Sequence, residues 1–236
     1  MERKFYLIVM AAGHGTRLGG PVPKQFQEVD GIPILQHTIE RFLEAEPDLR
    51  VVTVLPEDCI ELWKECCLRH NFPCPQTLVK GGITRFHSVR NALGKVPDGV
   101  VAAIHDGVRP LVSPSLIRRM REQMEHCPAL IPVIPSVDTL QRLRKEEDGS
   151  LSALEGGPLD RSTVWRVQTP QMFHSEVIRR AYASAYDPSF TDDASVARHT
   201  NIPLSYIEGE RYNLKITTAE DLQVVRTLIL RSGGLR

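Results

Sequence analysis

The residues that could do chemistry begin in segment 10–25, which is rich in small residues and carries two cations, Arg17 and Lys24. Glycines let a backbone approach a phosphate closely, and successive N–H groups can form a concavity that binds an anion. Cations next to such a concavity can neutralise the charge that develops during phosphoryl transfer. The segment therefore predicts a loop that binds the phosphates of a nucleotide.

Two common phosphate loops do not match this segment. The dinucleotide fingerprint G-x-G-x-x-G requires a third glycine, where this chain has Leu18 after Gly13 and Gly15. The P-loop requires Lys and then Ser or Thr directly after its last glycine, but Pro21 follows here. Both templates are excluded, and a strand-to-helix turn without a ligand remains the alternative for the loop considered alone.

The elements that must position this loop alternate between strand and helix patterns. Apolar runs predict strands at 5–9, 51–55, 77–80, 100–104 and 129–134, and helical patterns follow near 33, over 56–70 and 85–93, and after 113. Strands that each precede a helix pair in parallel through right-handed crossovers. We therefore predict an α/β fold, a single Rossmann-like domain over residues 1–236, with a mostly parallel sheet flanked by helices.

The later half continues this pattern after an interruption. Strands are predicted at 163–168 and 204–207, and helices over 175–186 and 194–198. Thr191 or Asp192 could cap the second of these helices. A capping-box pattern from Thr217 to Glu220 precedes the last amphipathic helix.

Three distant segments are expected at one edge of the sheet. Ligands of such sheets bind outside the carboxyl ends of the strands. That rule brings together the 10–25 loop, the Gly81–Gly82 turn and the segment 105–110, which contains Asp106 and Arg109. Bare backbone, a carboxylate and cations would then face one site.

Segment 136–160 breaks the alternation. Two weak strands are predicted, at 139–144 and 151–154, around the turn Glu147-Asp148-Gly149. Neither has a strong apolar face, so the hairpin cannot sit in the core. We expect an arm that projects from the body and is stabilised by a second subunit; a solvated loop is the alternative.

The composition limits the classes of partner. The 29 basic and 29 acidic side chains cancel over 236 residues, so no global field attracts nucleic acid or membrane, and neither partner is expected. No run of about 18 apolar residues occurs, and the apolar N-terminal run is too short for a signal peptide. Five cysteines without a C-x-x-C pair predict free thiols in the cytoplasm. Cys66, Cys67, His70 and Cys74 match no zinc module.

These motifs together resemble a known group of enzymes. The opening loop with Pro23-Lys24-Gln25 resembles that of the nucleotidyltransferases that activate sugar and polyol phosphates. Later segments make the chain similar, over nearly its whole length, to the 2-C-methyl-D-erythritol 4-phosphate cytidylyltransferase family. They are Gly81-Gly82 with Arg85 and Ser88, His105-Asp106 with Arg109-Pro110, Asp138-Thr139, Asp160-Arg161, Thr169-Pro170-Gln171, Thr191-Asp192 with Ala194-Ser195, and Asn213 with Lys215.

The resemblance implies that CTP donates a cytidylyl group to the polyol phosphate and that pyrophosphate leaves, within isoprenoid biosynthesis. It implies Mg²⁺, held mainly by the CTP phosphates with Asp106 as a candidate contact, and a homodimer formed through the 136–160 arm. The implied catalytic residues are Arg17, Lys24, Arg161 and Lys215. The implied CTP contacts are Ala11, Ala12, Gly13, Gly15, Gly82, Arg85 and Ser88. The implied acceptor contacts are Asp106, Arg109, Thr139, Arg161, Thr169 and Thr191.

At two positions the chain departs from the family pattern, and two other functions remain as alternatives. Gln141 stands where the family commonly carries Lys, and Gly107 stands where Ala is usual. A ribitol phosphate cytidylyltransferase would perform the same chemistry on another acceptor, although that relative tends to read Ala-Gly-Gly where this chain has Ala11-Ala12-Gly13. A nucleotide-binding regulator without catalysis is the rival from another class, and the presence of Arg17 and Lys24 argues against it.

Overall fold

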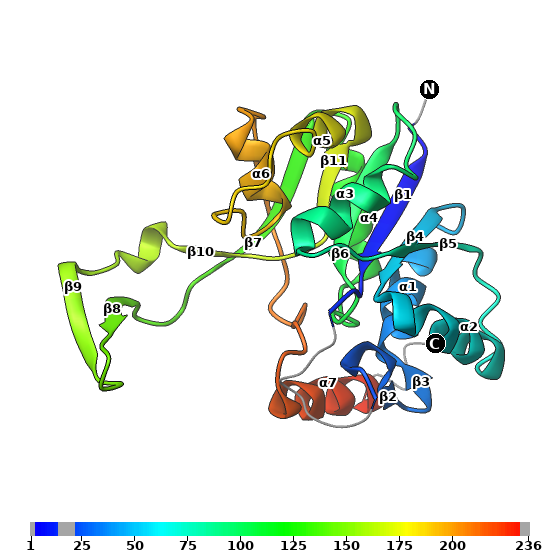
Figure 1. The fold of residues 1–236 in the computed structure, drawn as a ribbon, viewed down its shortest axis with the longest axis horizontal. Coiled ribbons are helices and arrows are strands. Elements are labelled where there is room, and N and C mark those ends of the chain that lie inside the picture. Colours follow the sequence, from blue (N-terminus) through cyan, green and yellow to red (C-terminus); the bar gives the residue numbers. More distant parts are fainter. Residues whose placement is uncertain (1–2, 14–21, 232–236) are drawn as a thin grey trace.

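The computed structural model describes residues 3–13 and 22–231. Its body is built around one mixed sheet, seen near the centre of Figure 1, with the strand order β10-β7-β11-β6-β1-β4-β5 and with β12 also paired to β7. The strands are β1 (Phe5–Met10), β4 (Arg50–Leu55), β5 (Gln76–Lys80), β6 (Val101–Asp106), β7 (Ala129–Pro135), β10 (Trp165–Val167), β11 (Gln171–His174) and β12 (Ser205–Glu208). The mostly parallel α/β architecture is confirmed.

The parallel part of the sheet carries the edge at which the sequence predicted a site. Strand β1 pairs in parallel with both β4 and β6, and β4 pairs in parallel with β5. Their carboxyl ends therefore lie at one edge, as the strand–helix alternation predicted. Strand β11 was not predicted: it lies between β6 and β7 and is antiparallel to both. It is only four residues long and follows Pro170, so its sequence carries little strand pattern.

Helices cover both faces of this sheet, because alternate residues of each buried strand point to opposite sides. Leu7 and Val9 belong to the core shared with α1 (Ile34–Ala45), α2 (Ile60–Arg69) and α4 (Pro114–Gln123). Ile8 belongs to the core shared with α3 (Arg85–Leu93), α5 (Ser175–Ala181) and α6 (Asp193–His199). The last helix, α7 (Ala219–Arg231), packs through Val225 and Ile229 onto a third, smaller cluster. Within the described ranges, no helix is both long and apolar enough to cross a membrane.

Helix starts follow the predicted caps with small shifts. Thr84 and Ser113 accept hydrogen bonds from the first turns of α3 and α4, as expected. Asp192, rather than Thr191, caps α6 and forms a capping box with Ser195. The last helix is capped one residue later than predicted, because Thr218 pairs reciprocally with Asp221. The predicted 175–186 helix ends early, at Ala181, where the chain passes into turns.

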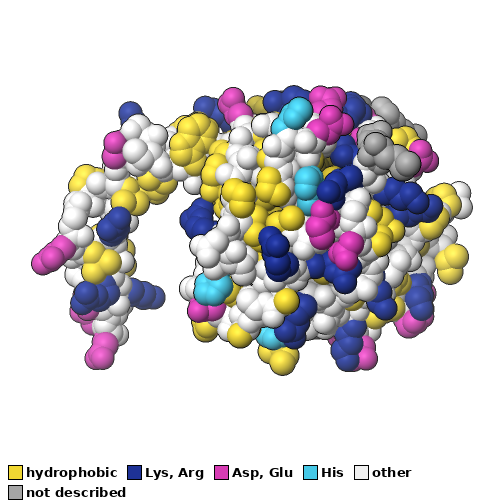
Figure 2. Space-filling view, turned by 90° about the horizontal axis from the view of Figure 1, so that it is seen from above, with side chains coloured by type: hydrophobic (Ala, Val, Ile, Leu, Met, Phe, Trp, Pro, Cys, Tyr) yellow, Lys and Arg dark blue, Asp and Glu magenta, His cyan; other side chains and the backbone are white. Residues whose placement is uncertain are grey.

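The arm departs from the body as predicted. Strands β8 (Gln141–Lys145) and β9 (Leu151–Pro158) pair only with each other and lie far to the left of the sheet in Figure 1. A short 3-10 turn, Arg161–Thr163, connects the arm to β10, so the predicted 163–168 strand begins later than expected. Figure 2 shows the arm standing clear of the body, with apolar side chains among charged ones.

Candidate active site

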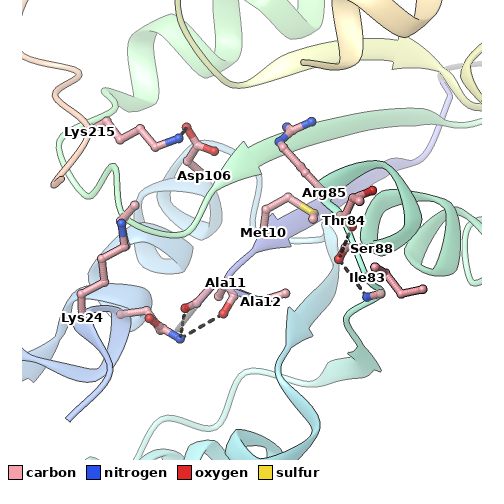
Figure 3. Close-up of a pocket in the computed structure, with 14 residues that line it drawn as sticks. Met10, Ala11, Ala12, Lys24, Ile83, Thr84, Arg85, Ser88, Asp106 and Lys215 are labelled. Carbon is pink, nitrogen blue, oxygen red and sulfur yellow. Dashed lines mark hydrogen bonds and ion pairs between the residues drawn. The ribbon is translucent and has the colours of Figure 1, made fainter. Parts of the chain in front are cut away.

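A cavity of about 520 Å³ lies at the carboxyl edge of β1 and β6. It brings together the three segments that the sequence placed at this edge, together with a fourth near the C-terminus. Figure 3 shows these residues around one space. The lining residues are Met10, Ala11, Ala12, Gly13, Lys24, Gln25, Gly82, Ile83, Thr84, Arg85, Ser88, Asp106, Val108 and Lys215. Arg17 and Gly15 lie outside the described residues.

The described part of the opening loop is held by Gln25, a residue to which the sequence assigned no role of its own. The buried Gln25 amide donates hydrogen bonds to the carbonyl oxygens of Ala11 (3.0 Å) and Gly13 (3.2 Å). Those two oxygens would otherwise repel an anion at the loop. The Gln25 side chain therefore favours a loop that accepts phosphate.

The second wall is the tight turn between β5 and α3. The Gly82 N–H donates to the Ser88 hydroxyl (2.9 Å), which in turn donates to the Thr84 carbonyl (3.0 Å). A Cβ at Gly82 would lie 2.5 Å from the Cβ of His87, so a larger residue cannot occupy this position without a shift. Glycine is required here by close packing, and the backbone stays accessible to a ligand.

Two lysines that are far apart in sequence meet at the cavity. Lys24 Nζ donates to the carbonyl oxygen of Ile216 (3.3 Å), and the neighbouring Lys215 places its Nζ 3.2 Å from Asp106 Oδ2. Both ammonium groups belong to residues that line the same space (Figure 3). The arrangement concentrates positive charge where a triphosphate would need it.

Asp106 is the carboxylate of this cavity. Burial alone would raise its pKa, but Lys215 and then Arg109 lower it well below the ordinary range. Arg109 Nε lies 3.0 Å from Asp106 Oδ2, and its Nη1 donates to the Asn213 carbonyl (2.8 Å). Asp106 is therefore ionised at neutral pH, and Arg109 is largely enclosed by the protein itself.

The Thr169 hydroxyl contacts the backbone of Asp106 and the ring of His105. This hydroxyl accepts from the Asp106 N–H (3.1 Å), which leaves its proton for Nδ1 of His105 (3.0 Å). These partners assign the other proton to His105 Nε2, which donates to the Arg109 carbonyl (3.3 Å). Burial lowers the pKa of His105 to about 3, so this imidazole is neutral. The sequence had assigned no role to His105.

Arg85 reaches the cavity from α3 and is held by a partner that the sequence had not singled out. Its two terminal nitrogens donate to the two carboxylate oxygens of Asp193, at 2.8 and 2.6 Å. Tyr182 also donates to Asp193 (2.6 Å). No local pattern marks this pair, because Arg85 and Asp193 are separated by 108 positions.

Of the residues assigned to the acceptor by resemblance, Asp106 lines the cavity, Arg109 and Thr169 contact Asp106 without lining it, and three others lie elsewhere. None of Thr139, Arg161 and Thr191, all of them described, lines this cavity, and all three are exposed. Arg161 lies in the short turn at the end of the arm, and Thr139 precedes β8 (Figure 1). Within one chain, the structure brings together the nucleotide side of the predicted site but not these acceptor residues.

Comparisons with known proteins identify the family of this chain. The chain matches the family described as 2-C-methyl-D-erythritol 4-phosphate cytidylyltransferase over residues 5–232. A Bacteroides thetaiotaomicron protein of that name is 40% identical over 94% of this chain and 98% of its own length. One from Porphyromonas gingivalis is 42% identical over 97% and 99%, respectively.

A solved structure has the same fold. The Francisella tularensis 2-C-methyl-D-erythritol 4-phosphate cytidylyltransferase is 28% identical, with a TM-score of 0.77 over 95% of this chain and 99% of that one. Sequence similarity and fold similarity to these proteins thus both extend over nearly the full length of this chain. This chain belongs to the 2-C-methyl-D-erythritol 4-phosphate cytidylyltransferase family.

Proposed function

We propose that this chain transfers the cytidylyl group of CTP to 2-C-methyl-D-erythritol 4-phosphate and releases pyrophosphate. The observation that carries the proposal is the meeting of Lys24, Lys215 and Asp106 with the bare backbone of Ala11 to Gly13 in one cavity. Family membership supplies the reaction, and the cavity supplies groups that suit it.

The chemistry is an in-line displacement at phosphorus. An oxygen of the acceptor phosphate forms a bond to the α-phosphorus of CTP, and the bond from that phosphorus to the bridging oxygen of pyrophosphate breaks. The attacking phosphate is largely ionised near neutral pH because its second pKa is about 6, so no general base is required. Catalysis then depends on alignment and on stabilising negative charge. Lys24 and Lys215 supply the positive charge that stabilises it, and we assign Arg17 the same role.

The nucleotide contacts follow from the walls of the cavity. We assign the triphosphate to the backbone of Ala11, Ala12 and Gly13; because the Ala11 N–H donates to the Val54 carbonyl (2.9 Å), the N–H groups assigned to the anion are those of Ala12 and Gly13. We also assign Gly15 to the nucleotide, as the resemblance implies. Gly82 and Ser88 form the wall at which we place the cytidine. Arg85 adds directed N–H groups at the same cavity.

The acceptor side requires a second copy of the chain. Asp106, Arg109 and Thr169 form the part of this side that one chain supplies, whereas Thr139, Arg161 and Thr191 are exposed. We propose a homodimer in which the arm of one subunit brings Thr139 and Arg161 to the cavity of the other. Exposed apolar residues support it: Leu143, Leu151 and Leu154 on the arm, and Trp165, Val167 and Tyr206 around a groove on the body.

Divalent metal fits this site as a companion of the substrate. No group of three metal-ligating side chains occurs in the part of the chain that the structure describes. Mg²⁺ commonly binds through one carboxylate, water and substrate phosphates, and Asp106 is an ionised carboxylate at the cavity. When bound, the ion would neutralise triphosphate charge. We also propose a cytoplasmic location, consistent with five free cysteines.

One assay tests the function. Pyrophosphate release is measured with CTP and Mg²⁺ while 2-C-methyl-D-erythritol 4-phosphate and ribitol 5-phosphate are offered separately. Release with the first acceptor is expected. Release with ribitol 5-phosphate alone would overturn the choice of acceptor, and CTP binding without release from any acceptor would indicate the regulator.

A further inference from the structure

The Arg85–Asp193 ion pair lies beside the cavity, because Arg85 is one of the lining residues. The Asp193 side chain is fully buried (0% exposed), whereas the Arg85 side chain is 32% exposed. Because Arg85 also lines the cavity, a bound ligand can reach the Arg85 side chain but not that of Asp193.

Asp193 changes what Arg85 can contribute. Its carboxylate occupies two of the five N–H groups of the guanidinium and balances its charge. An ammonium group such as that of Lys24 or Lys215 acts as a point charge, whereas the planar guanidinium of Arg85 is a fork that Asp193 holds, so its remaining N–H groups have a set direction. Arg85 therefore supplies directed hydrogen bonds more than net positive charge.

Asp193 is itself held from several sides. The Tyr182 hydroxyl donates to Asp193 Oδ1, and Asp193 is the first residue of α6. Gln171 of β11 fixes the start of that helix, because its side chain accepts from Ala194 N–H (2.8 Å) and donates to Asp192 (2.8 Å). The ion pair thus links α3, which carries Arg85, to α6, whose first turn is held by Gln171 of β11.

We propose that Asp193 is a positioning residue for the nucleotide: it holds the Arg85 guanidinium so that the unengaged N–H groups meet oxygen acceptors of bound CTP. The proposal rests on the proposed function, which assigns the cavity to CTP. Asp193 itself contacts no substrate. Its loss weakens nucleotide binding only through Arg85.

A double-mutant cycle measures this dependence. The dissociation constant for CTP is determined by calorimetry, without acceptor, for the parent, Asp193→Asn, Arg85→Met and the double variant. Asp193→Asn is expected to weaken CTP binding on the order of tenfold, the worth of one hydrogen bond to a charged group. In the Arg85→Met background the same change should have no further effect. An equal loss in both backgrounds, or no loss in either, would overturn the proposal.

Two further variants keep the test decisive. Arg85→Lys retains the charge but not the fork, so it should also weaken CTP binding about tenfold even if Asp193→Asn does not fold. CTP binding equal to that of the parent would overturn the directed role. Glu176→Gln removes the carboxylate charge that pairs with Arg3 elsewhere in the body and should leave CTP binding unchanged.

Each failure identifies a different error. If Glu176→Gln weakens binding as much as Asp193→Asn does, the effect is a general one of losing an ion pair, and the proposal is wrong. If the parent binds CTP and neither variant at the pair changes that binding, the positioning role alone is wrong. If the parent binds no CTP, the proposed function is wrong.

Discussion

Two regions are built on opposite principles: the cavity segments that we assign to CTP (10–13, 24–25 and 82–88), here called the nucleotide wall, and the arm (136–160). On the nucleotide wall, buried side chains such as Gln25 and Ser88 hold backbone groups through short hydrogen bonds, and Asp193 holds Arg85 in the same way. On the arm, every residue of β8 is exposed, and Leu151 is 66% exposed. The described part of one region is held by contacts within a single chain, and the other leaves apolar area in water.

The proposed function assigns the two regions to different substrates, and the difference in their construction suits that assignment. A triphosphate needs a preorganised set of donors, because donors that are already in place need no rearrangement at the moment of reaction. The arm by itself cannot form such a preorganised arrangement, because a two-stranded hairpin with neither face covered is only marginally stable in water. We therefore expect it to acquire its order, and its role toward the acceptor, from a second copy.

The largest expected effect is on the nucleotide wall. Lys24→Ala should lower turnover on the order of a thousandfold, because it removes a positive charge that we assign to the developing pyrophosphate. Pyrophosphate release measures this, and circular dichroism checks that the variant is folded. Lys64→Ala, which removes an exposed lysine of α2, is the matched control and should retain parental turnover. Near-normal turnover of Lys24→Ala would remove this residue from catalysis.

The arm is tested by mixing subunits. Arg161→Ala alone should lower turnover about a hundredfold, since a misplaced acceptor reacts poorly. When Arg161→Ala subunits are mixed with Lys24→Ala subunits and allowed to exchange, the mixture should show roughly a quarter of parental activity. Half of the dimers are then mixed, and each mixed dimer carries one intact site. If the mixture stays inactive, Arg161 serves its own chain and the two regions are less different than proposed.

The charge cluster at Asp106 gives an effect on stability. The pKa of Asp106 in the folded state lies below its unfolded value of about 3.9. The ion pairs of Asp106 therefore stabilise the fold above about pH 4, and this stabilisation is lost as the pH falls through the folded pKa. At pH 7, Asp106→Asn should cost on the order of 2 kcal/mol of unfolding free energy. Urea titrations at several pH values should show this difference shrinking below pH 4. A difference that does not depend on pH would contradict the assignment.

The smallest expected effect is on self-association. Leu151→Ser should weaken dimer formation about tenfold, because it removes apolar area that a second copy would cover. Sedimentation measures the dissociation constant. Leu68→Ser changes an equally apolar residue, 82% exposed on α2, and should have no such effect. A monomeric parent would refute the dimer altogether.

Much of the fold could be predicted from local patterns. Helix α3 has the predicted bounds, and strands β1, β4, β5 and β7 differ from the predicted ranges by one residue at most at each end. Apolar periodicity and caps depend on neighbours in the chain, so they can be identified without tertiary structure. Strand β11 could not, because its four residues become a strand only by insertion between β6 and β7.

The candidate site divides in the same way. The sequence alone determined that this is an α/β chain whose loops after β1, β5 and β6 share an edge, since strand–helix alternation forces parallel strands. Only the tertiary structure decided that Lys24 donates to the carbonyl beside Lys215, that Asp193 holds Arg85, and that Arg161 lies away from its own cavity. Those placements join residues up to 192 positions apart, and contacts at that range depend on the packing of the whole core, which no local pattern encodes.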